Sequence, residues 1–121
     1  METTINEIEV NGKKYVLKGT ENKLAEDVNG MSFVLIRTYS AGVHFGYLKR
    51  KEGKEVELVN AQRIWSWSGA CSLSQIAVEG VKGESKISVE IPSIILTEAI
   101  EIIPITEDAK ENLKGVAIWK K

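Results

Sequence analysis

The sequence predicts an α+β domain, in which a mostly antiparallel β-sheet is accompanied by an N-terminal hairpin and two short helices. Segments rich in β-branched and aromatic residues alternate with glycine-containing turns, as is typical of antiparallel strands. Ser72 and Thr106 each precede a short segment with helical spacing, in the position of a helix N-cap. The 121 residues fit a single domain, with a hairpin and connector in residues 1–30 and a core in residues 31–121.

The N-terminal segment, residues 5–19, has the pattern of a β-hairpin. Apolar and polar residues alternate on both sides of Asn11-Gly12, a pair that favours the positive φ angles of a type I′ turn. Residues 20–30 are polar and irregular, so we expect them to form a connector between this hairpin and the core.

Three strands are expected at the centre of the core. Residues 31–39 are almost continuously apolar, which indicates a central strand. Residues 43–51 and 55–67 follow after glycine-containing turns and form the next two strands. The apolar positions of the third strand change parity along its length, which indicates either a β-bulge near Asn60 or a strand that passes from one packing environment to another.

A short helix is expected after these strands. Ser72 and Gln75 have the spacing of a capping box, so the helix should span residues 73–79 and end at Gly80. A short strand at residues 86–90 should follow.

The last part of the core contains one ambiguous segment. Residues 94–105 are rich in β-branched residues and lie between prolines, which favours a strand, while the Thr-Glu-Ala-Ile-Glu stretch inside them leaves a helix open. Thr106 should then cap a second helix at residues 107–113, and Gly115 should end it.

The composition argues against several classes of protein. A net charge of −1 without a basic stripe does not suit a protein that binds duplex nucleic acid. No apolar run approaches the ~18 residues of a membrane span, and the polar first residues lack the pattern of a signal peptide. A single cysteine fits a reducing compartment. We therefore expect a cytoplasmic protein that contacts neither membrane nor duplex nucleic acid.

The residues that could carry out catalysis are few. Asp27 and Asp108 are the only aspartates, and a nucleophile–base pair would have to use Cys71 and His44, which have no motif around them. Neither a cluster of metal ligands nor a glycine-rich phosphate loop is present in the sequence. The sequence therefore predicts a protein that is not an enzyme and has no metal site or cofactor. His44 is expected to be a surface or sheet residue, and Cys71 a small buried one.

Arginines are candidates for ligand binding because the chain has three of them against 13 lysines. Arg37 lies in an apolar strand and Arg63 precedes two tryptophans, and a guanidinium group suits phosphate oxygens and stacks on aromatic rings. The alternative is that these arginines pair with Glu55, Glu57 or Glu79 and stabilise the sheet.

Aromatic side chains could hold a purine base by stacking. Trp67 adjoins a break in its strand and Tyr39 ends a strand beside a turn, so both are candidates for ligand contact. Trp65 is expected to pack in the core instead.

The small polar segment at residues 68–75 leads into a predicted helix N-terminus, where free backbone N–H groups attract anions. Ser68 and Ser72 could add hydroxyl donors, although Ser72 could simply cap its own helix. The predicted ligand-binding residues are therefore Arg37, Tyr39, Arg63, Trp67, Ser68 and Ser72.

Three stretches carry a resemblance to known proteins. They are RTYSAGVHFG at residues 37–46, NAQRIWSWSGACSLSQIAVEGV at residues 60–81, and ILTEAIEIIPITE at residues 95–107. Together they resemble a family of small bacteriophage and prophage proteins, many of which are known only as a domain of unknown function. The similarity covers about residues 31–119.

The chain is also similar to the Thoeris anti-defence (Tad) sponge proteins of phages. That resemblance implies an oligomeric protein of the host bacterial cytosol that binds cyclic ADP-ribose-type signals made by TIR-domain enzymes, or cyclic oligonucleotides. Such a protein sequesters the signal and does not degrade it. No site residue is transferred from this family.

The alternative function is a phage structural or protein-interaction module without a small-molecule ligand, in which tryptophans anchor an interface. The branched apolar residues of 94–105, the N-terminal hairpin and Trp119 exceed what a small core needs. We therefore expect a homo-oligomer with a buried β-strand or tail contact.

Overall fold

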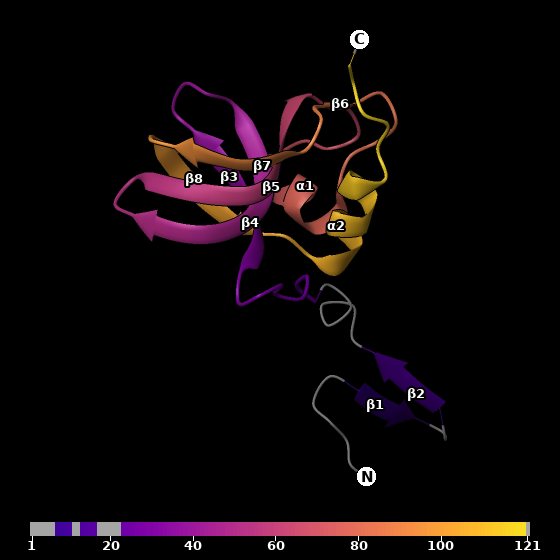
Figure 1. Cartoon of the computed structure of the whole chain (residues 1–121). Coiled ribbons are helices and arrows are strands. Elements are labelled where there is room, and N and C mark those ends of the chain that lie inside the picture. The colour runs from indigo at the N-terminus through magenta and orange to yellow at the C-terminus, as the bar shows by residue number, and fades with distance from the viewer. Residues whose placement is uncertain (1–6, 11–12, 17–22, 121) are drawn as a thin grey trace.

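The computed structural model describes residues 7–10, 13–16 and 23–120, and it contains one two-stranded sheet, one six-stranded sheet and two short helices (Figure 1). All the strand pairings within the two sheets are antiparallel. The predicted α+β class is therefore confirmed.

The N-terminal hairpin is formed by β1 (Glu7–Val10) and β2 (Lys13–Val16), which pair with Val10 opposite Lys13. This register leaves two residues for the connection, as a tight hairpin requires. The predicted turn at Asn11-Gly12 itself lies outside the described residues, and so do residues 20–22 of the expected connector.

The rest of the connector is attached to the core. The backbone N–H of Ala25 donates to the carbonyl of Ile105 at 2.9 Å, and Asn29 and Gly30 form a tight turn with φ angles of 54° and 79°. Residues 23–30 are thus more ordered than their polar composition suggested.

The centre of the large sheet is a meander of β3 (Ser32–Thr38), β4 (Val43–Glu52) and β5 (Glu55–Ser66). These bounds agree within one residue with the three predicted strands. On β5, the first half pairs with β7 (Ile91–Leu96) and the second half with β6 (Lys86–Ile87).

The ambiguous segment contributes the end of β7 and the whole of β8 (Ala99–Pro104), which pairs with β3. The strand interpretation is confirmed, and the turn between the two strands lies inside the stretch that left a helix open. The carbonyl of Glu98 in this turn accepts from the N–H of Tyr39 at 3.0 Å, which fixes the turn against the end of β3.

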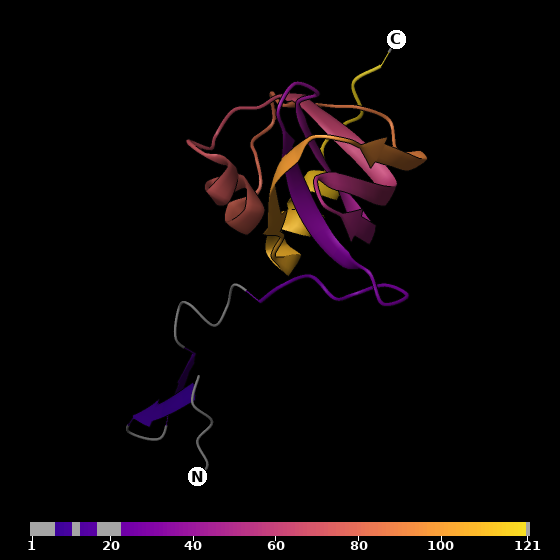
Figure 2. The ribbon, with the colours of Figure 1, turned by 90° about the vertical axis from the view of Figure 1, so that its left-hand side faces the viewer.

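The sheet must curl, because β7 and β8 pair with opposite sides of the meander although only residues 97 and 98 separate them in the chain. Figure 2 shows this curl. A concave apolar cluster fills its inside, and its buried members are Val34, Ile36, Val56, Leu58, Ala61 and Leu96.

The convex face of the sheet is covered by α1 (Leu73–Glu79) and α2 (Glu107–Lys114). Both helices begin where predicted: the Ser72 hydroxyl accepts from the N–H of Gln75, and the Thr106 hydroxyl accepts from the N–H of Ala109, each at 3.1 Å. A second core cluster lies between these helices and the sheet and includes Phe33, Leu35, Phe45, Ile76, Ile105 and Leu113. Because both faces of the sheet are buried, the sequence of β3 is a nearly continuous run of apolar residues.

The predicted bulge near Asn60 is present. Asn60 has a φ angle of 51°, and the register of β4 and β5 shifts between Phe45 and Tyr47. Gly46 lies at this shift, where an added Cβ would be 3.0 Å from the Cα of Ala61 and from the carbonyl oxygen of Val59. The bulge moves the odd-numbered residues that follow it, beginning with Ala61, onto the concave face.

No helix in the described part of the chain has the length and apolar character needed to cross a membrane.

Candidate functional site

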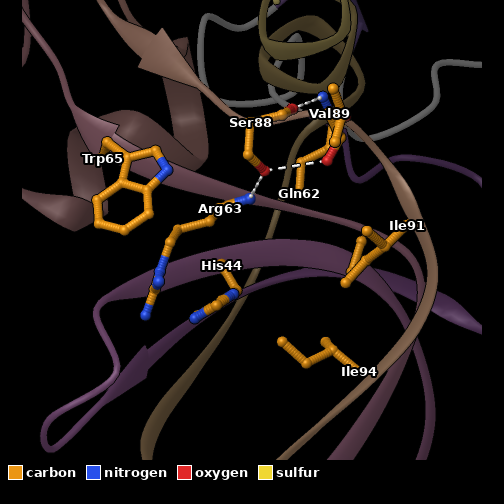
Figure 3. Close-up of a pocket in the computed structure, with 9 residues that line it drawn as sticks. His44, Gln62, Arg63, Trp65, Ser88, Val89, Ile91 and Ile94 are labelled. Carbon is orange, nitrogen blue, oxygen red and sulfur yellow. Dashed lines mark hydrogen bonds between the residues drawn. The ribbon is translucent and has the colours of Figure 1, made fainter. Parts of the chain in front are cut away.

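A partly open cleft of about 220 Å³ lies between the concave face of the sheet and the segment that joins β6 to β7 (Figure 3). The mouth of a curled sheet is a common place for ligand sites. The walls of the cleft have an apolar side and a smaller set of polar side chains. They are formed by His44, Ala61, Gln62, Arg63, Trp65, Ser88, Val89, Ile91 and Ile94.

His44 reaches the cleft from β4. It lies directly opposite Ile36 on β3 and opposite Arg63 on β5, and its side chain is buried, with 3% of the residue exposed. The ring Nε2 donates to the carbonyl oxygen of Ala41 at 2.9 Å. Burial lowers the pKa of His44 below its ordinary value, the bond to Ala41 opposes this change, and the charge of Arg63 adds to it. The neutral form of the ring is therefore favoured at pH 7.

Arg63 shares the acceptor that His44 uses. Its Nε donates to the Ala41 oxygen at 3.1 Å, and its Nη2 donates to the same oxygen. Nη1 makes no hydrogen bond to any residue in the described part of the chain, so this end of the guanidinium group remains able to bind an anion.

An aromatic group extends from the rim of the cleft. The guanidinium carbon of Arg63 lies 4.4 Å from the centre of the Trp65 ring, and Trp65 meets Trp119 edge to face at 6.1 Å. The Lys86 ammonium group lies 5.1 Å from the Trp119 ring. Half of each tryptophan is exposed, 53% of Trp65 and 50% of Trp119. We call these four residues, Arg63, Trp65, Trp119 and Lys86, the aromatic rim.

The chain brings the rim together from distant segments. Because of the bulge at Asn60, Arg63 and Trp65 lie on the concave side of β5. Trp119 arrives with the C-terminal tail, whose backbone is held by a 2.8 Å hydrogen bond from the N–H of Trp119 to the carbonyl of Ile87. The rim therefore depends on pairing between the tail and β6.

Ser88 and Gln62 fix the wall opposite His44 (Figure 3). The Ser88 hydroxyl accepts from the backbone N–H of Arg63 at 2.9 Å and donates to the carbonyl of Val89 at 3.0 Å. Gln62 Nε2 donates to the carbonyl of Ser88 at 3.0 Å. These bonds hold the segment between β6 and β7 against β5.

Of the six predicted ligand-binding residues, only Arg63 lines the cleft. Arg37 is exposed, and its guanidinium group lies 3.9 Å from the carboxylate of Glu101, a partner that the sequence did not indicate. Tyr39 is 77% exposed and lies beside Lys54 and Glu98 in a shallow hollow of its own.

The other three predicted residues lie near the start of α1. Trp67 packs against the convex cluster, and its indole N–H donates to the carbonyl of Ala70 at 3.3 Å. The backbone N–H of Ser68 donates to the Ser85 hydroxyl at 3.1 Å. Ser72 caps α1, as the alternative interpretation had it. The structure thus separates the predicted residues into groups and does not bring them to one site.

Two expectations about single residues are wrong. Trp65 was expected in the core but is exposed, because the bulge directs it past the end of the concave cluster. Cys71 was expected to be buried but is exposed, in the turn that precedes α1.

Sequence reasoning missed His44, Trp65, Ser88, Lys86 and Trp119 as site residues. The parity change at Asn60 was a usable signal for Trp65, since it predicts which face each later residue of β5 takes. No local signal places Trp119, because its position depends on pairing between residues about 30 positions apart. Among the described residues, no three His, Cys, Asp or Glu side chains come together as a metal site would require.

Comparison with known proteins adds one finding. No similar protein was found among the curated proteins or the solved structures. The model of one family matches residues 31–113, which is more than half of the chain and includes Arg63, Trp65 and His44. This protein therefore belongs to the family described as a domain of unknown function, DUF6948.

Proposed function

We propose that this protein is a non-catalytic binding protein that holds a small anionic ligand with an aromatic base, of the cyclic nucleotide class, at the cleft and its aromatic rim. The observation that carries the proposal is the position of the Arg63 guanidinium group over the exposed Trp65 ring at the mouth of the cleft. A cation beside an exposed indole suits a ligand that joins a phosphate to a base.

Both parts of such a ligand have a partner at this site. Nη1 of Arg63 can donate to a phosphate oxygen, and the exposed parts of Trp65 and Trp119 can stack on a base. Lys86 adds a second cation at the far end of the rim. The apolar wall, with Ile91 and Ile94, can bury part of the ligand.

The chemistry of the lining supports binding without degradation. Among the described residues that line the cleft there is no carboxylate and no cysteine, and the one imidazole, that of His44, has neither an acidic partner nor a cluster of metal ligands beside it. Hydrolysis of a phosphodiester needs a positioned base or metal to activate water. A ligand held here would be released intact.

The resemblance to the Thoeris anti-defence sponges suggests the specific ligand. In this proposal the protein sequesters a cyclic ADP-ribose-type signal in the host bacterial cytosol, away from the effector that the signal would activate. The net charge of −1 is compatible with this role, because a weakly charged protein does not retain nucleic acid non-specifically.

The test is uptake followed by release. The purified protein is incubated with a panel of cyclic ADP-ribose isomers and cyclic dinucleotides, free ligand is removed, and bound ligand is recovered after heat denaturation. Recovery of intact ligand supports the proposal, and recovery of a cleaved product would indicate an enzyme. Failure to retain any member of the panel would overturn it.

A matched pair of variants locates the site. Trp65→Ala should weaken retention, because stacking on one base contributes about 1–3 kcal/mol. Tyr39→Ala removes an aromatic ring outside the cleft that is even more exposed than Trp65, 77% against 53%, and should leave retention unchanged. Equal retention by both variants would place the ligand elsewhere.

A second candidate function is a protein-interaction module that forms a homo-oligomer. It is favoured by the exposed apolar surface around the rim, where Val89 and Ile118 are 44% and 41% exposed beside the two tryptophans. Exposed tryptophans commonly anchor interfaces. Light scattering at micromolar concentration tests it: an oligomer that Trp119→Ala converts to a monomer supports this candidate, and a monomeric wild-type protein contradicts it.

A further inference from the structure

The floor of the cleft contains a polar group that the proposed binding mode leaves unused. His44 is almost completely buried, it lines the cleft, and only its Nε2 has a hydrogen-bond partner among the described residues. No fully buried side-chain nitrogen or oxygen among the described residues lacks a hydrogen-bond partner, so the unpartnered Nδ1 must be accessible from the cleft. The Nδ1 atom of His44 is therefore available to a bound molecule.

We propose that His44 is a second anion-binding group of the cleft and that it takes up a proton when an anionic ligand binds beside Arg63. The inference rests on the proposed function of the same cleft, and it names a contact residue and a pH dependence that the proposed function does not contain.

The hydrogen bonds around Ala41 support this role. The carbonyl oxygen of Ala41 has two lone pairs but receives three donors, Nε2 of His44 and both Nε and Nη2 of Arg63. The three donors therefore compete for this one acceptor. An arriving phosphate oxygen offers a better acceptor to Arg63, because a hydrogen bond between two charged groups is stronger than one to a neutral carbonyl.

The charges around His44 determine the direction of the proton transfer. On β5 it faces Arg63, on β3 it faces Ile36, and across the cleft β7 presents Ile91 and Ile94. Among the described residues that line the cleft, Arg63 and His44 are the only ones that carry or can gain a charge. In the free protein, burial and the positive charge of Arg63 oppose protonation of the ring.

An anion bound at Arg63 reverses this balance. It cancels the repulsion from the guanidinium group and provides a negative charge close to the ring, so the pKa of His44 rises. A protonated ring keeps its Nε2 bond to Ala41 and gains an N–H at Nδ1, which can donate to the ligand. Ligand binding is therefore coupled to the uptake of one proton.

The experiment uses the fact that His44 is the only histidine in the sequence. Its ring resonances are followed by NMR against pH, with an untagged protein, in the absence and presence of saturating cyclic ADP-ribose. We expect the titration midpoint of His44 to lie below the ordinary value of 6.5 in the free protein. In the complex the midpoint should be at least about one pH unit higher than in the free protein. An unchanged midpoint would overturn the inference.

Calorimetry supplies an independent measurement. Titration of cyclic ADP-ribose into the protein in buffers of different ionisation heat gives the number of protons taken up, which should approach one at a pH between the two midpoints. The affinity should rise by up to about tenfold for each unit of decrease in pH across this interval. His44→Gln keeps an amide donor for Ala41 but cannot take up a proton, so its affinity should lose this part of the pH dependence.

The outcomes separate the two proposals. If neither cyclic ADP-ribose nor any other member of the panel binds at any pH, the proposed function fails and this inference fails with it. If it binds while the His44 resonances titrate as in the free protein, the function stands and the inference is wrong. The wild-type NMR titration decides this even if His44→Gln does not fold.

Discussion

His44 and Arg63 donate hydrogen bonds to the same acceptor, the carbonyl oxygen of Ala41. The shared oxygen lies in the turn between β3 and β4, so two side chains on neighbouring strands fix the turn that borders the cleft. The arrangement holds the guanidinium group over Trp65 without a carboxylate partner. An arginine with no acidic partner in the described part of the chain keeps its charge available for a ligand.

The first prediction concerns the shape of this cation. Arg63→Lys keeps the positive charge but removes the planar guanidinium group. In the wild type this group donates to Ala41, lies over the Trp65 ring and leaves Nη1 free to bind a phosphate. The affinity for cyclic ADP-ribose should fall by at least about tenfold, which corresponds to about 1.4 kcal/mol, and calorimetry measures this change.

Arg37→Lys is the matched control, since Arg37 is an exposed arginine outside the cleft. The affinity of this variant for cyclic ADP-ribose should equal that of the wild type. If Arg63→Lys binds as well as Arg37→Lys, the guanidinium group of Arg63 does not contact the ligand.

The second prediction concerns the bulge that directs β5 into the cleft. Gly46→Ala would place a Cβ 3.0 Å from the Cα of Ala61 and 3.0 Å from the carbonyl oxygen of Val59, and both of these are backbone atoms that cannot easily move. We expect the free energy of unfolding to fall by about 1–3 kcal/mol, as for other overpacked cores. Urea denaturation followed by circular dichroism measures it.

Gly83→Ala is the control for this substitution. No atom lies within 4 Å of the added Cβ, so the free energy of unfolding should stay within about 0.5 kcal/mol of the wild type. A Gly46→Ala protein as stable as Gly83→Ala would mean that the two strands do not approach this closely.

The strands and helices could be predicted because their signals are local. Alternating apolar residues, or in β3 a nearly continuous apolar run, indicate the strands. The side chains of Ser72 and Thr106 cap the helices within three residues of themselves. The bulge was also visible, because Asn60 separates two runs of opposite parity.

The site could not be predicted in the same way. Arg63 was identified by its residue type, but its neighbours depend on the curl of the sheet, which follows from the pairing of β7 with β5 and of β8 with β3. Trp65 was expected in the core, but it lies near the end of β5, where the concave cluster no longer covers it. Arg37 and Arg63 lie 26 residues apart, and both were predicted to bind the ligand because each carries a guanidinium group. Only Arg63 lines the cleft.

The third prediction concerns the C-terminal tail. Trp119 contributes half of the indole pair at the rim, and its backbone N–H bonds the carbonyl of Ile87. Trp119→Ala should weaken the binding of cyclic ADP-ribose by about 1 kcal/mol or more, because one stacking surface is lost. The substitution should also change the fluorescence of Trp65, because the Trp65 ring meets the Trp119 ring in the wild type.

The same substitution should have little effect on stability, because half of the Trp119 side chain is already exposed. We expect a change of less than about 1 kcal/mol in the free energy of unfolding, as for surface positions. A large loss of stability would instead mean that the tail is part of the core, and a change in binding could not then be assigned to the rim.

The fourth prediction concerns stability against pH. The pKa of His44 in the folded protein lies below its ordinary value of 6.5, chiefly because burial penalises the charged ring. An unfolded chain therefore binds a proton more readily than the folded one, so protonation favours unfolding. The contribution of His44 to stability is complete above about pH 7 and is lost as the pH falls from about 6.5 to the folded pKa, below which it stays constant.

A second group acts in a lower range of pH. The hydrogen bond from Lys114, 2.5 Å long, lowers the pKa of Glu90 below its ordinary value of 4.5, so the stability that this carboxylate provides is lost only as the pH falls below that value. Urea denaturation at a series of pH values should thus show two declines. His44→Gln should remove the upper decline and keep the lower one, whereas Lys114→Ala should reduce the lower and keep the upper. An upper decline that survives in His44→Gln would mean that another group titrates there, and the neutral, buried state of His44 in the free protein would lose its support.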